Sequence, residues 1–119
     1  MGLVKIVAGL ENVARPAARR DVELLVDTGA LYSMVPGEIL RELGVEPYDK
    51  MEFELADGSV MEREIGEVRF RLNGRRAVSV VIFGQEKDAG VLGVVTLEAM
   101  GLEVDPVRKQ LRPMRMIMY

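Results

Sequence analysis

The chain has 119 residues, of which 49% are hydrophobic and 29% charged, a composition that suits one folded domain and excludes a disordered chain. Its formal net charge is -3, and its 16 basic residues are scattered among 19 acidic ones, which argues against a nucleic-acid-binding surface. The sequence contains no Cys and no His, so disulfides, metals bound by Cys or His, and catalytic triads built on His are excluded. We therefore expect any acid–base chemistry to come from carboxylates, Lys, Tyr or water.

The N-terminal third of the chain predicts two strands joined by a loop. Residues 4–8 are apolar, as in a short strand, whereas residues 10–20 are polar, contain a proline and predict a turn and loop. Residues 22–26 predict a mostly buried strand that ends at Asp27-Thr28-Gly29, and residues 30–35 continue in an extended conformation. The apolar stretch at residues 6–10 is too short for a signal peptide, and no run approaches the ~20 apolar residues of a membrane span, so we expect a cytoplasmic protein without a membrane partner.

A short helix follows. Pro36-Gly37-Glu38 opens it, because proline is suited to the first turn of a helix. Apolar side chains recur at helical spacing over residues 39–43, and Gly44 is a natural residue for the end of a helix.

Two β-hairpins are predicted in the middle of the chain. Residues 51–55 and 60–65 flank Asp57-Gly58, a dipeptide that accommodates the positive φ angles of a tight hairpin turn. Asn73-Gly74 gives the same signal between two further alternating segments, and residues 84–88 form a polar loop.

The last part of the chain predicts a second helix and short strands. Small apolar residues at 89–95 lead into a helix over residues 96–100, with Thr96 as its N-cap and Gly101 as its end. Residues 102–104 predict a brief strand, and Asp105-Pro106 predicts a turn. Leu111 and residues 114–119 predict a final strand. Many short strands with hairpin turns predict an all-β architecture, in a single domain over residues 1–119.

Asp27 stands where a buried strand breaks into Thr28-Gly29. A carboxylate at the edge of apolar packing loses hydration, which raises the cost of its charged form. Gly29 allows the backbone to turn sharply and to bring N–H groups close to that carboxylate. Asp-Thr-Gly is also a common turn sequence, so these residues alone leave both a turn and a catalytic carboxylate open.

A longer pattern around Asp27 resembles the active-site segment of the retropepsin-like (retroviral-type) aspartic proteases: Leu25-Val26-Asp27-Thr28-Gly29-Ala30, then Ser33, Val35 and Pro36, then a helix that ends at Leu43-Gly44. Gly90-Val91-Leu92-Gly93, with the helix and Gly101-Leu102 after it, resembles the second signature of that family. The hairpin at Asp57-Gly58 stands where these proteases carry their flap, a hairpin that covers the substrate.

The resemblance implies a closed β-barrel lobe with one or two short helices, similar to the cellular archaeal and bacterial members of the family. It also implies a homodimer, because the chain supplies one Asp-Thr-Gly and the active site of this family needs two. Two carboxylates a few ångström apart cannot both ionise easily, so they share one proton. One then acts as base on a water molecule while the other polarises the scissile carbonyl of an extended peptide or protein substrate, without any cofactor or metal.

The resemblance assigns roles to three groups of residues. Asp27 is the catalytic carboxylate, Thr28 bonds across the twofold axis, and Gly29 contacts the carboxylate and the substrate. The residues expected to contact the substrate come from the active-site loop, the flap tip and the second signature: Ala30, Leu31, Ala56, Asp57, Gly58, Ser59, Val91 and Leu92. Leu31 and Tyr32 stand where retroviral enzymes usually have a polar residue, which bears on substrate preference.

Other hypotheses remain at this point. The fold could serve as a peptide-binding or dimerisation module with little or no proteolytic activity, or as a plain barrel scaffold. Four glutamates on alternating hairpin positions are either a cation site or a solvated face: Glu52, Glu54, Glu62 and Glu64. Three methionines in residues 114–118 favour a strand at a dimer interface over a peptide-binding surface.

Overall fold

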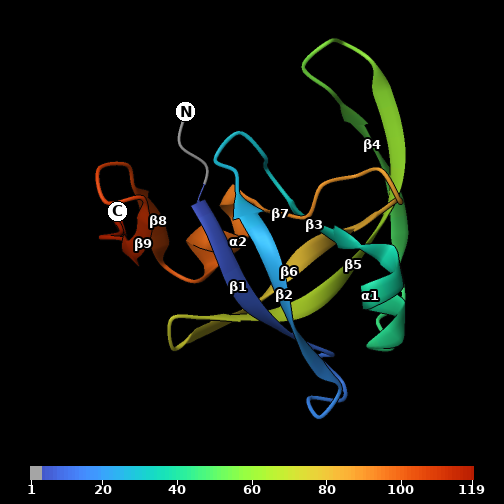
Figure 1. Cartoon of the computed structure of the whole chain (residues 1–119), viewed down its shortest axis with the longest axis horizontal. Coiled ribbons are helices and arrows are strands. Elements are labelled where there is room, and N and C mark those ends of the chain that lie inside the picture. Colours follow the sequence, from blue (N-terminus) through green and yellow to red (C-terminus); the bar gives the residue numbers. More distant parts are fainter. Residues whose placement is uncertain (1–3) are drawn as a thin grey trace.

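The computed structural model describes residues 4–119, which form nine strands and two short helices (Figure 1). The strands are β1 (Val4–Glu11), β2 (Arg19–Val26), β3 (Ser33–Pro36), β4 (Asp49–Glu54), β5 (Val60–Leu72), β6 (Arg75–Gly84), β7 (Val91–Leu92), β8 (Leu102–Asp105) and β9 (Gln110–Pro113). The helices are α1 (Gly37–Glu42) and α2 (Val94–Ala99). The predicted all-β class with two short helices is confirmed. Residues 1–3 of the predicted domain lie outside the described residues.

The main sheet closes on itself. Its strand order is β1-β2-β7-β3-β6-β5-β4, and β1 pairs with β5 as well, so the first six of these strands form a closed ring of pairings. In the closing pair, Leu10 lies opposite Phe70, and both side chains are fully buried. Because alternate strand residues point inward, the closed sheet encloses a core of mainly aliphatic side chains. Each fully buried Val, Leu or Phe side chain contributes roughly 1.5–3 kcal/mol.

Strand β7 lies between β2 and β3, although it comes much later in the chain. It runs parallel to β2, with Val91 opposite Leu25, and antiparallel to β3, with Val91 opposite Met34. The loop that joins β2 to β3 must therefore pass over the end of β7. That crossing places the residues after Asp27 against the residues after Leu92.

Both predicted hairpins are present. Gly58 has a φ of 88°, and Asn73 and Gly74 have φ angles of 52° and 76°, as tight turns between antiparallel strands require. Within residues 4–119, β4 is hydrogen-bonded to β5 alone, so the β4–β5 hairpin projects from the barrel (Figure 1, green).

Three predicted boundaries are wrong. The loop expected over residues 10–20 is shorter, because β1 continues to Glu11 and β2 begins at Arg19, where each pairs with the other. Strand β3 begins only at Ser33, since the preceding residues cross over β7. The expected final strand over residues 114–119 does not form: Met114 N–H donates to Gly101 O at 2.8 Å, and no strand is present after β9.

Thr96 is not the N-cap of the second helix, as the sequence predicted. Helix α2 begins at Val94, with Gly93 as its N-cap residue, so Thr96 lies inside the helix and is fully buried. The helix starts earlier because the N–H groups of Val94 and Val95 donate to the carbonyls of Ala30 and Leu31, at 2.9 and 3.0 Å. Neither helix within residues 4–119 is long and apolar enough to cross a membrane.

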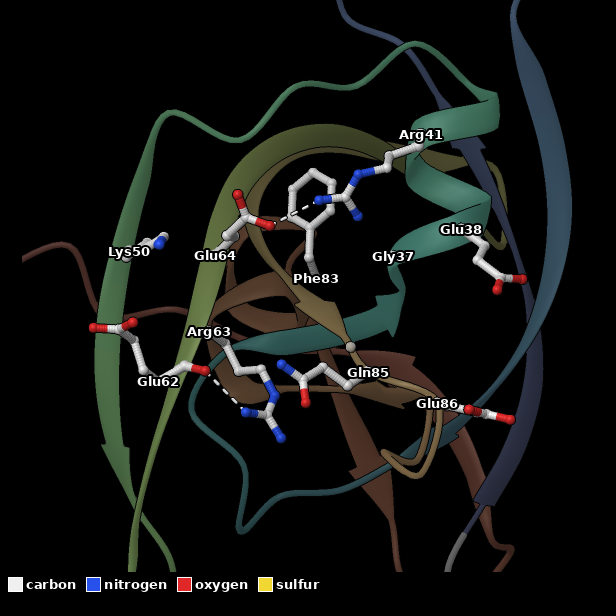
Figure 2. Close-up of a pocket in the computed structure, with 11 residues that line it drawn as sticks. Gly37, Glu38, Arg41, Lys50, Glu62, Arg63, Glu64, Phe83, Gln85 and Glu86 are labelled. Atoms are coloured by element: carbon white, nitrogen blue, oxygen red, sulfur yellow. Dashed lines mark hydrogen bonds and ion pairs between the residues drawn. The ribbon is translucent and has the colours of Figure 1, made fainter.

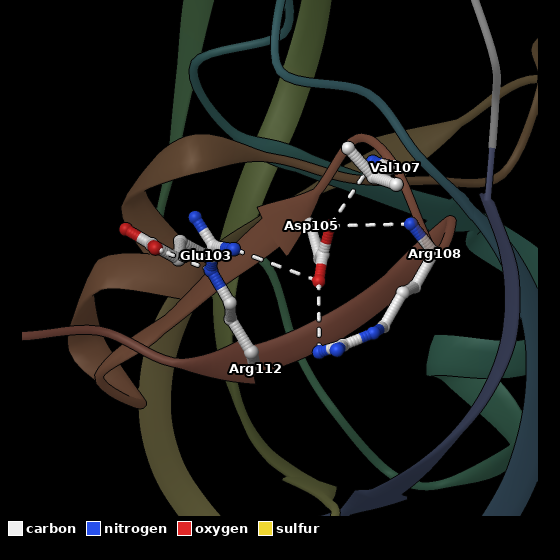
Figure 3. Close-up of polar contacts among 5 residues, drawn as sticks. All are labelled: Glu103, Asp105, Val107, Arg108 and Arg112. Atoms are coloured by element: carbon white, nitrogen blue, oxygen red, sulfur yellow. Dashed lines mark hydrogen bonds and ion pairs between the residues drawn. The ribbon is translucent and has the colours of Figure 1, made fainter.

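The C-terminal hairpin of β8 and β9 is closed by Asp105 (Figure 3). Its carboxylate accepts the N–H groups of Val107 and Arg108, at 3.0 and 3.2 Å, and forms ion pairs with the side chains of Arg108 and Arg112. The bond from the Arg108 backbone, with that of Val107 and the two arginine charges, holds the pKa of the Asp105 carboxyl below its usual range. Asp105-Pro106 is thus a turn, as predicted.

Candidate active site

Asp27 immediately follows β2, and its backbone is fixed by hydrogen bonds to β7 and to the residue before β7. Leu25 N–H donates to Gly90 O at 3.1 Å, and Asp27 N–H donates to Leu92 O at 3.0 Å. The side chain of Leu92 is fully buried beneath this pairing. Asp27 itself is partly exposed at the rim of the barrel. The second signature of the sequence therefore supports the first directly, through main-chain hydrogen bonds.

The carboxylate of Asp27 is held by its own loop. Gly29 N–H donates to Asp27 Oδ1 at 2.9 Å, and Ala30 N–H donates to the Asp27 carbonyl at 3.1 Å. A Cβ at Gly29 would lie 3.2 Å from Oδ1, so glycine leaves room for this close approach. Within residues 4–119 the carboxylate has no ion-pair partner, which leaves it available to a group from outside the chain.

Gly93 allows the loop after Asp27 to cross β7. A Cβ at Gly93 would lie 2.6 Å from the carbonyl carbon of Tyr32 and 2.8 Å from the carbonyl oxygen of Leu31, both of them backbone atoms. No other residue fits there without moving the loop. The glycine that ends the second signature thus gives room for a close approach of two backbones.

Three buried hydroxyl groups lie beneath the crossing. Gly93 N–H donates to Ser33 Oγ at 3.0 Å, Ser33 Oγ lies 2.5 Å from Thr96 Oγ1, and Thr96 Oγ1 lies 3.0 Å from Ser79 Oγ. The hydroxyls connect β3, α2 and β6. Sequence reasoning missed this network; the available signal was that Ser79 is the one polar residue in the run of residues 77–83.

The residues predicted to contact a substrate are mostly accessible. Thr28, Gly29 and the tip residues 56–59 are exposed, and Leu31 has 63% of its surface exposed. Leu92 differs, because its buried side chain packs in the core. At the tip, the hydroxyl of Ser59, and then its backbone N–H, donate to Asp57 and lower the pKa of that carboxyl. The structure thus brings residues 27–31 and 91–93 together, and it places the tip of the hairpin on a separate element.

One aromatic contact connects the hairpin to the active-site loop. The rings of Tyr32 and Phe53 meet edge to face, with centroids 6.1 Å apart and an angle of 77° between their planes. Phe53 lies opposite Met61, so these side chains share one face of the hairpin. The same face also carries Met51, Ile65, Asp49 and Arg63, and it is the face that meets the loop after Asp27.

The four hairpin glutamates occupy the opposite face. Glu52 lies directly across from Glu62, and Glu64 forms an ion pair with Arg41 at 2.7 Å. Over residues 4–119, no group of three or more Asp, Glu, His or Cys side chains is placed to hold a metal ion. Of the two alternatives for these glutamates, a cation site and a solvated face, this arrangement favours the solvated face.

Comparison with known proteins gives three findings. The sequence model of the aspartyl protease family matches residues 17–96, which contain Asp27, Gly93 and Thr96. The solution structure of Simian Foamy Virus (mac) protease is similar with a TM-score of 0.52 and 17% identity, over 78% of this chain and 92% of that one. The foamy viral protease-reverse transcriptase, in complex with an RNA/DNA hybrid, is similar with a TM-score of 0.56 and 17% identity, over 89% of this chain.

This chain spans only 14% of the foamy viral protease-reverse transcriptase. No curated protein matches the sequence significantly. At these identities the likeness to the solved structures shows the fold, which is that of a retroviral protease.

Proposed function

The chain belongs to the aspartyl protease family, and we propose that it is an endopeptidase that hydrolyses peptide bonds with water activated by two Asp27 carboxylates, one from each of two copies. The observation that carries this proposal is the setting of Asp27. Its backbone is fixed by Leu92, its Oδ1 accepts Gly29 N–H, and the exposed Thr28 and Gly29 leave the loop open to a partner. A single chain brings one such carboxylate, so the site is completed by a second copy around a twofold axis.

The chemistry follows from the pairing of the two carboxylates. Because like charges in close contact disfavour double ionisation, one carboxyl carries a proton and the other is charged. The charged Asp27 takes a proton from the water, whose oxygen attacks the carbonyl carbon, while the protonated Asp27 donates to the carbonyl oxygen. The tetrahedral intermediate collapses when a proton reaches the amide nitrogen, and the C–N bond breaks to give an acid and an amine. The whole chain acts as one lobe of this enzyme.

The substrate in this proposal is an extended peptide that lies between the loop and the β4–β5 hairpin, bound by main-chain hydrogen bonds as an added strand. The hairpin then acts as the flap. Exposed apolar side chains on the loop and on the hairpin favour apolar substrate side chains, with Leu31, Leu55 and Val60 exposed by 63%, 43% and 59%. The proposed contacts are Ala30, Leu31, Ala56, Asp57, Gly58, Ser59, Val91 and, through its backbone, Leu92.

The C-terminal residues support a homodimer. Ile117, Met118 and Tyr119 are almost fully exposed, and Met116 is half exposed, although all four are large and apolar. Exposed apolar side chains in a contiguous group mark a surface that is covered by a partner. A second copy of the chain is the partner that the incomplete Asp27 site also requires.

The test is cleavage of a denatured protein between about pH 3 and pH 7, with a transition-state analogue of aspartic proteases as inhibitor control. We expect the wild type to cleave and Asp27→Asn to be inactive, while circular dichroism and sedimentation show the same fold and the same dimer. Asp21→Asn, at an exposed position of the same strand that leads to Asp27, is the matched control and retains the active-site carboxylate. Activity of Asp27→Asn equal to that of the wild type would refute the proposal.

Mixing tests whether the two carboxylates share one site. When the wild type is exchanged with an equal amount of Asp27→Asn, about one quarter of the dimers contain two intact Asp27 residues. Activity per wild-type chain then falls to about one half, whereas a monomeric enzyme keeps all of it. A peptide-binding module without proteolysis is the second candidate, and binding of peptides without turnover at every pH would support it.

A further inference from the structure

Arg63, in the stem of the β4–β5 hairpin, forms a two-pronged ion pair with a loop outside the hairpin. Its Nε donates to Asp88 Oδ2 at 2.8 Å, and its Nη2 donates to Asp88 Oδ1 at 3.2 Å. The two side chains are 14% and 15% exposed. The remaining nitrogen, Nη1, donates to the Glu62 carbonyl at 2.8 Å (Figure 2). All three nitrogens of the guanidinium are therefore engaged.

Asp88 is itself fixed by its loop. Gln85 N–H donates to Asp88 Oδ2 at 2.7 Å, and Asp88 N–H donates to the Gln85 carbonyl at 2.9 Å. This short loop leads directly into β7. Gly90, two residues after Asp88, accepts Leu25 N–H, and Leu92 accepts Asp27 N–H. The ion pair therefore joins the hairpin to the strand that fixes the backbone of Asp27.

The stem of the hairpin borders a pocket that is lined mostly by polar and charged residues. This pocket of about 520 Å³ lies between the stem, α1 and the loop after β6, and its lining includes the charged side chains of Lys50, Glu62 and Arg63 (Figure 2). With solvent beneath it, the stem depends on polar anchors for its position. Partly buried, two-pronged pairs of arginine and carboxylate are the strongest and most directional of these.

A second ion pair on the same stem provides an internal comparison. Arg41 Nη2 donates to Glu64 Oε1 at 2.7 Å, with one hydrogen bond and with side chains that are 54% and 36% exposed. Arg41 also lies over the ring of Phe83, 5.0 Å from its centroid. Exposed single-bond pairs contribute little, because water screens them and two long side chains must be ordered. The two pairs thus share an element and differ in burial and geometry.

We propose that the Arg63–Asp88 pair anchors the β4–β5 hairpin to the strand that supports Asp27, and that it thereby sets how tightly substrate is held over the active site. This inference rests on the proposed function for its kinetic part alone. Arg63 and Asp88 are positioning residues: they touch neither the substrate nor Asp27, and they act through the hairpin. Loss of the pair lets the hairpin move away, so substrate binding weakens while the chemistry at Asp27 is retained.

The kinetic test compares Asp88→Asn and Arg63→Gln with Arg41→Gln. We expect KM to rise on the order of tenfold in the first two variants, with kcat within about twofold of the wild type. Arg41→Gln changes both constants by less than about twofold. Arg63→Lys keeps the positive charge but cannot form the bidentate pair, so its KM is expected to lie between those of the wild type and Arg63→Gln. The double variant that exchanges the two residues, Arg63→Asp with Asp88→Arg, is expected to restore part of the substrate affinity. Equal KM values for Asp88→Asn and Arg41→Gln would overturn the inference, as would a loss confined to kcat.

Hydrogen exchange tests the anchor without any catalysis. In Asp88→Asn, the backbone amides of residues 51–63 and of Leu25 exchange faster than in the wild type, while those of the β8–β9 hairpin do not change. Arg41→Gln leaves all three regions as they are. Unchanged exchange in residues 51–63 of Asp88→Asn would refute the anchor even in an active enzyme. If the wild type proves inactive, the proposed function fails, and the exchange rates still decide whether the anchor exists.

Discussion

The side-chain oxygens of Ser33 and Thr96 lie 2.5 Å apart in the buried interior, although 63 residues separate the two in the sequence. Each hydroxyl can donate one hydrogen, so a consistent order runs from Gly93 N–H through Ser33 and Thr96 to Ser79. The network thus links the residue that lies against the active-site loop to three separate elements of the barrel.

Removing the middle hydroxyl is expected to weaken the fold. Thr96→Val keeps the branched shape and leaves Ser33 and Ser79 each short of a partner in a buried site. The free energy of unfolding falls by about 1–3 kcal/mol, as for other buried polar groups left unpaired. Urea denaturation measures the change, and Thr96→Ser, which keeps the hydroxyl, is the control. Equal losses in the two variants would show that the methyl group matters more than the hydrogen bonds.

Gly93→Ala is expected to disturb the active-site loop. The added Cβ would lie 2.6–2.8 Å from backbone atoms of Tyr32 and Leu31, which cannot give way as a side chain can. We expect the free energy of unfolding to fall by at least about 2 kcal/mol. In Gly9→Ala the nearest atom is 3.4 Å away, in ordinary contact, so that variant changes the free energy of unfolding by less than about 1 kcal/mol. Thermal and urea unfolding of both variants would reveal whether the crossing is as tight as the geometry indicates.

Glu11 is a buried carboxylate between two arginines. Its side chain is 2% exposed and forms ion pairs with Arg69 and Arg71 across the strands that close the barrel. Glu11→Ala removes both ion pairs and leaves Arg69 and Arg71 partly exposed to water, so the free energy of unfolding is expected to fall by about 1–3 kcal/mol. Glu23→Ala removes a partner of Lys5 at an exposed site and is expected to cost only about 0–1 kcal/mol. A similar small loss at both positions would contradict a structural role for Glu11.

The pH dependence of stability reports the state of Asp88. The hydrogen bond from Arg63, then that from Gln85 N–H and the charge of Arg63, hold the pKa of the Asp88 carboxyl below its ordinary value. Since the pKa is lower in the folded state than in the unfolded one, the charged form stabilises the fold above the unfolded pKa of about 3.9. That contribution is lost as the pH falls through the folded pKa.

The corresponding measurement is urea unfolding of the wild type and Asp88→Asn at several pH values. The difference in the free energy of unfolding is expected to be constant between about pH 5 and pH 7 and to shrink below about pH 4. A difference that stays the same down to pH 2, or that grows in acid, would show that Asp88 is not stabilised by its charge.

The sequence predicted correctly those features that depend on neighbouring residues, such as hairpin turns and the end of the first helix. Asp57-Gly58 and Asn73-Gly74 form hairpin turns, with positive φ angles at Gly58, Asn73 and Gly74. Gly44, with a φ of 78°, follows the first helix as expected. Asp27 was identified from a pattern of neighbouring residues, and the structure places the second signature directly beside it.

Pairings between distant residues could not be predicted in the same way. Thr96 has the local signature of an N-cap, but its partners, Ser33 and Ser79, come from other strands and bury it. Arg63 and Asp88 look like two ordinary surface charges in the sequence, and only the fold brings them into contact. A single sequence contains many acidic and basic residues, and it does not reveal which of them the fold brings together.

The place of β7 in the sheet affects when the candidate active site can form during synthesis of the chain. A ribosome releases residues 19–36 long before residues 90–93, so β2 and β3 emerge without the strand that lies between them. Until β7 has been synthesised, Asp27 N–H lacks its hydrogen bond to Leu92, and the loop between β2 and β3 cannot pack over the end of β7. Such long-range pairing makes folding slow. A chain truncated before residue 91 is therefore expected to leave the backbone of Asp27 unsupported, although it contains the whole Asp-Thr-Gly motif.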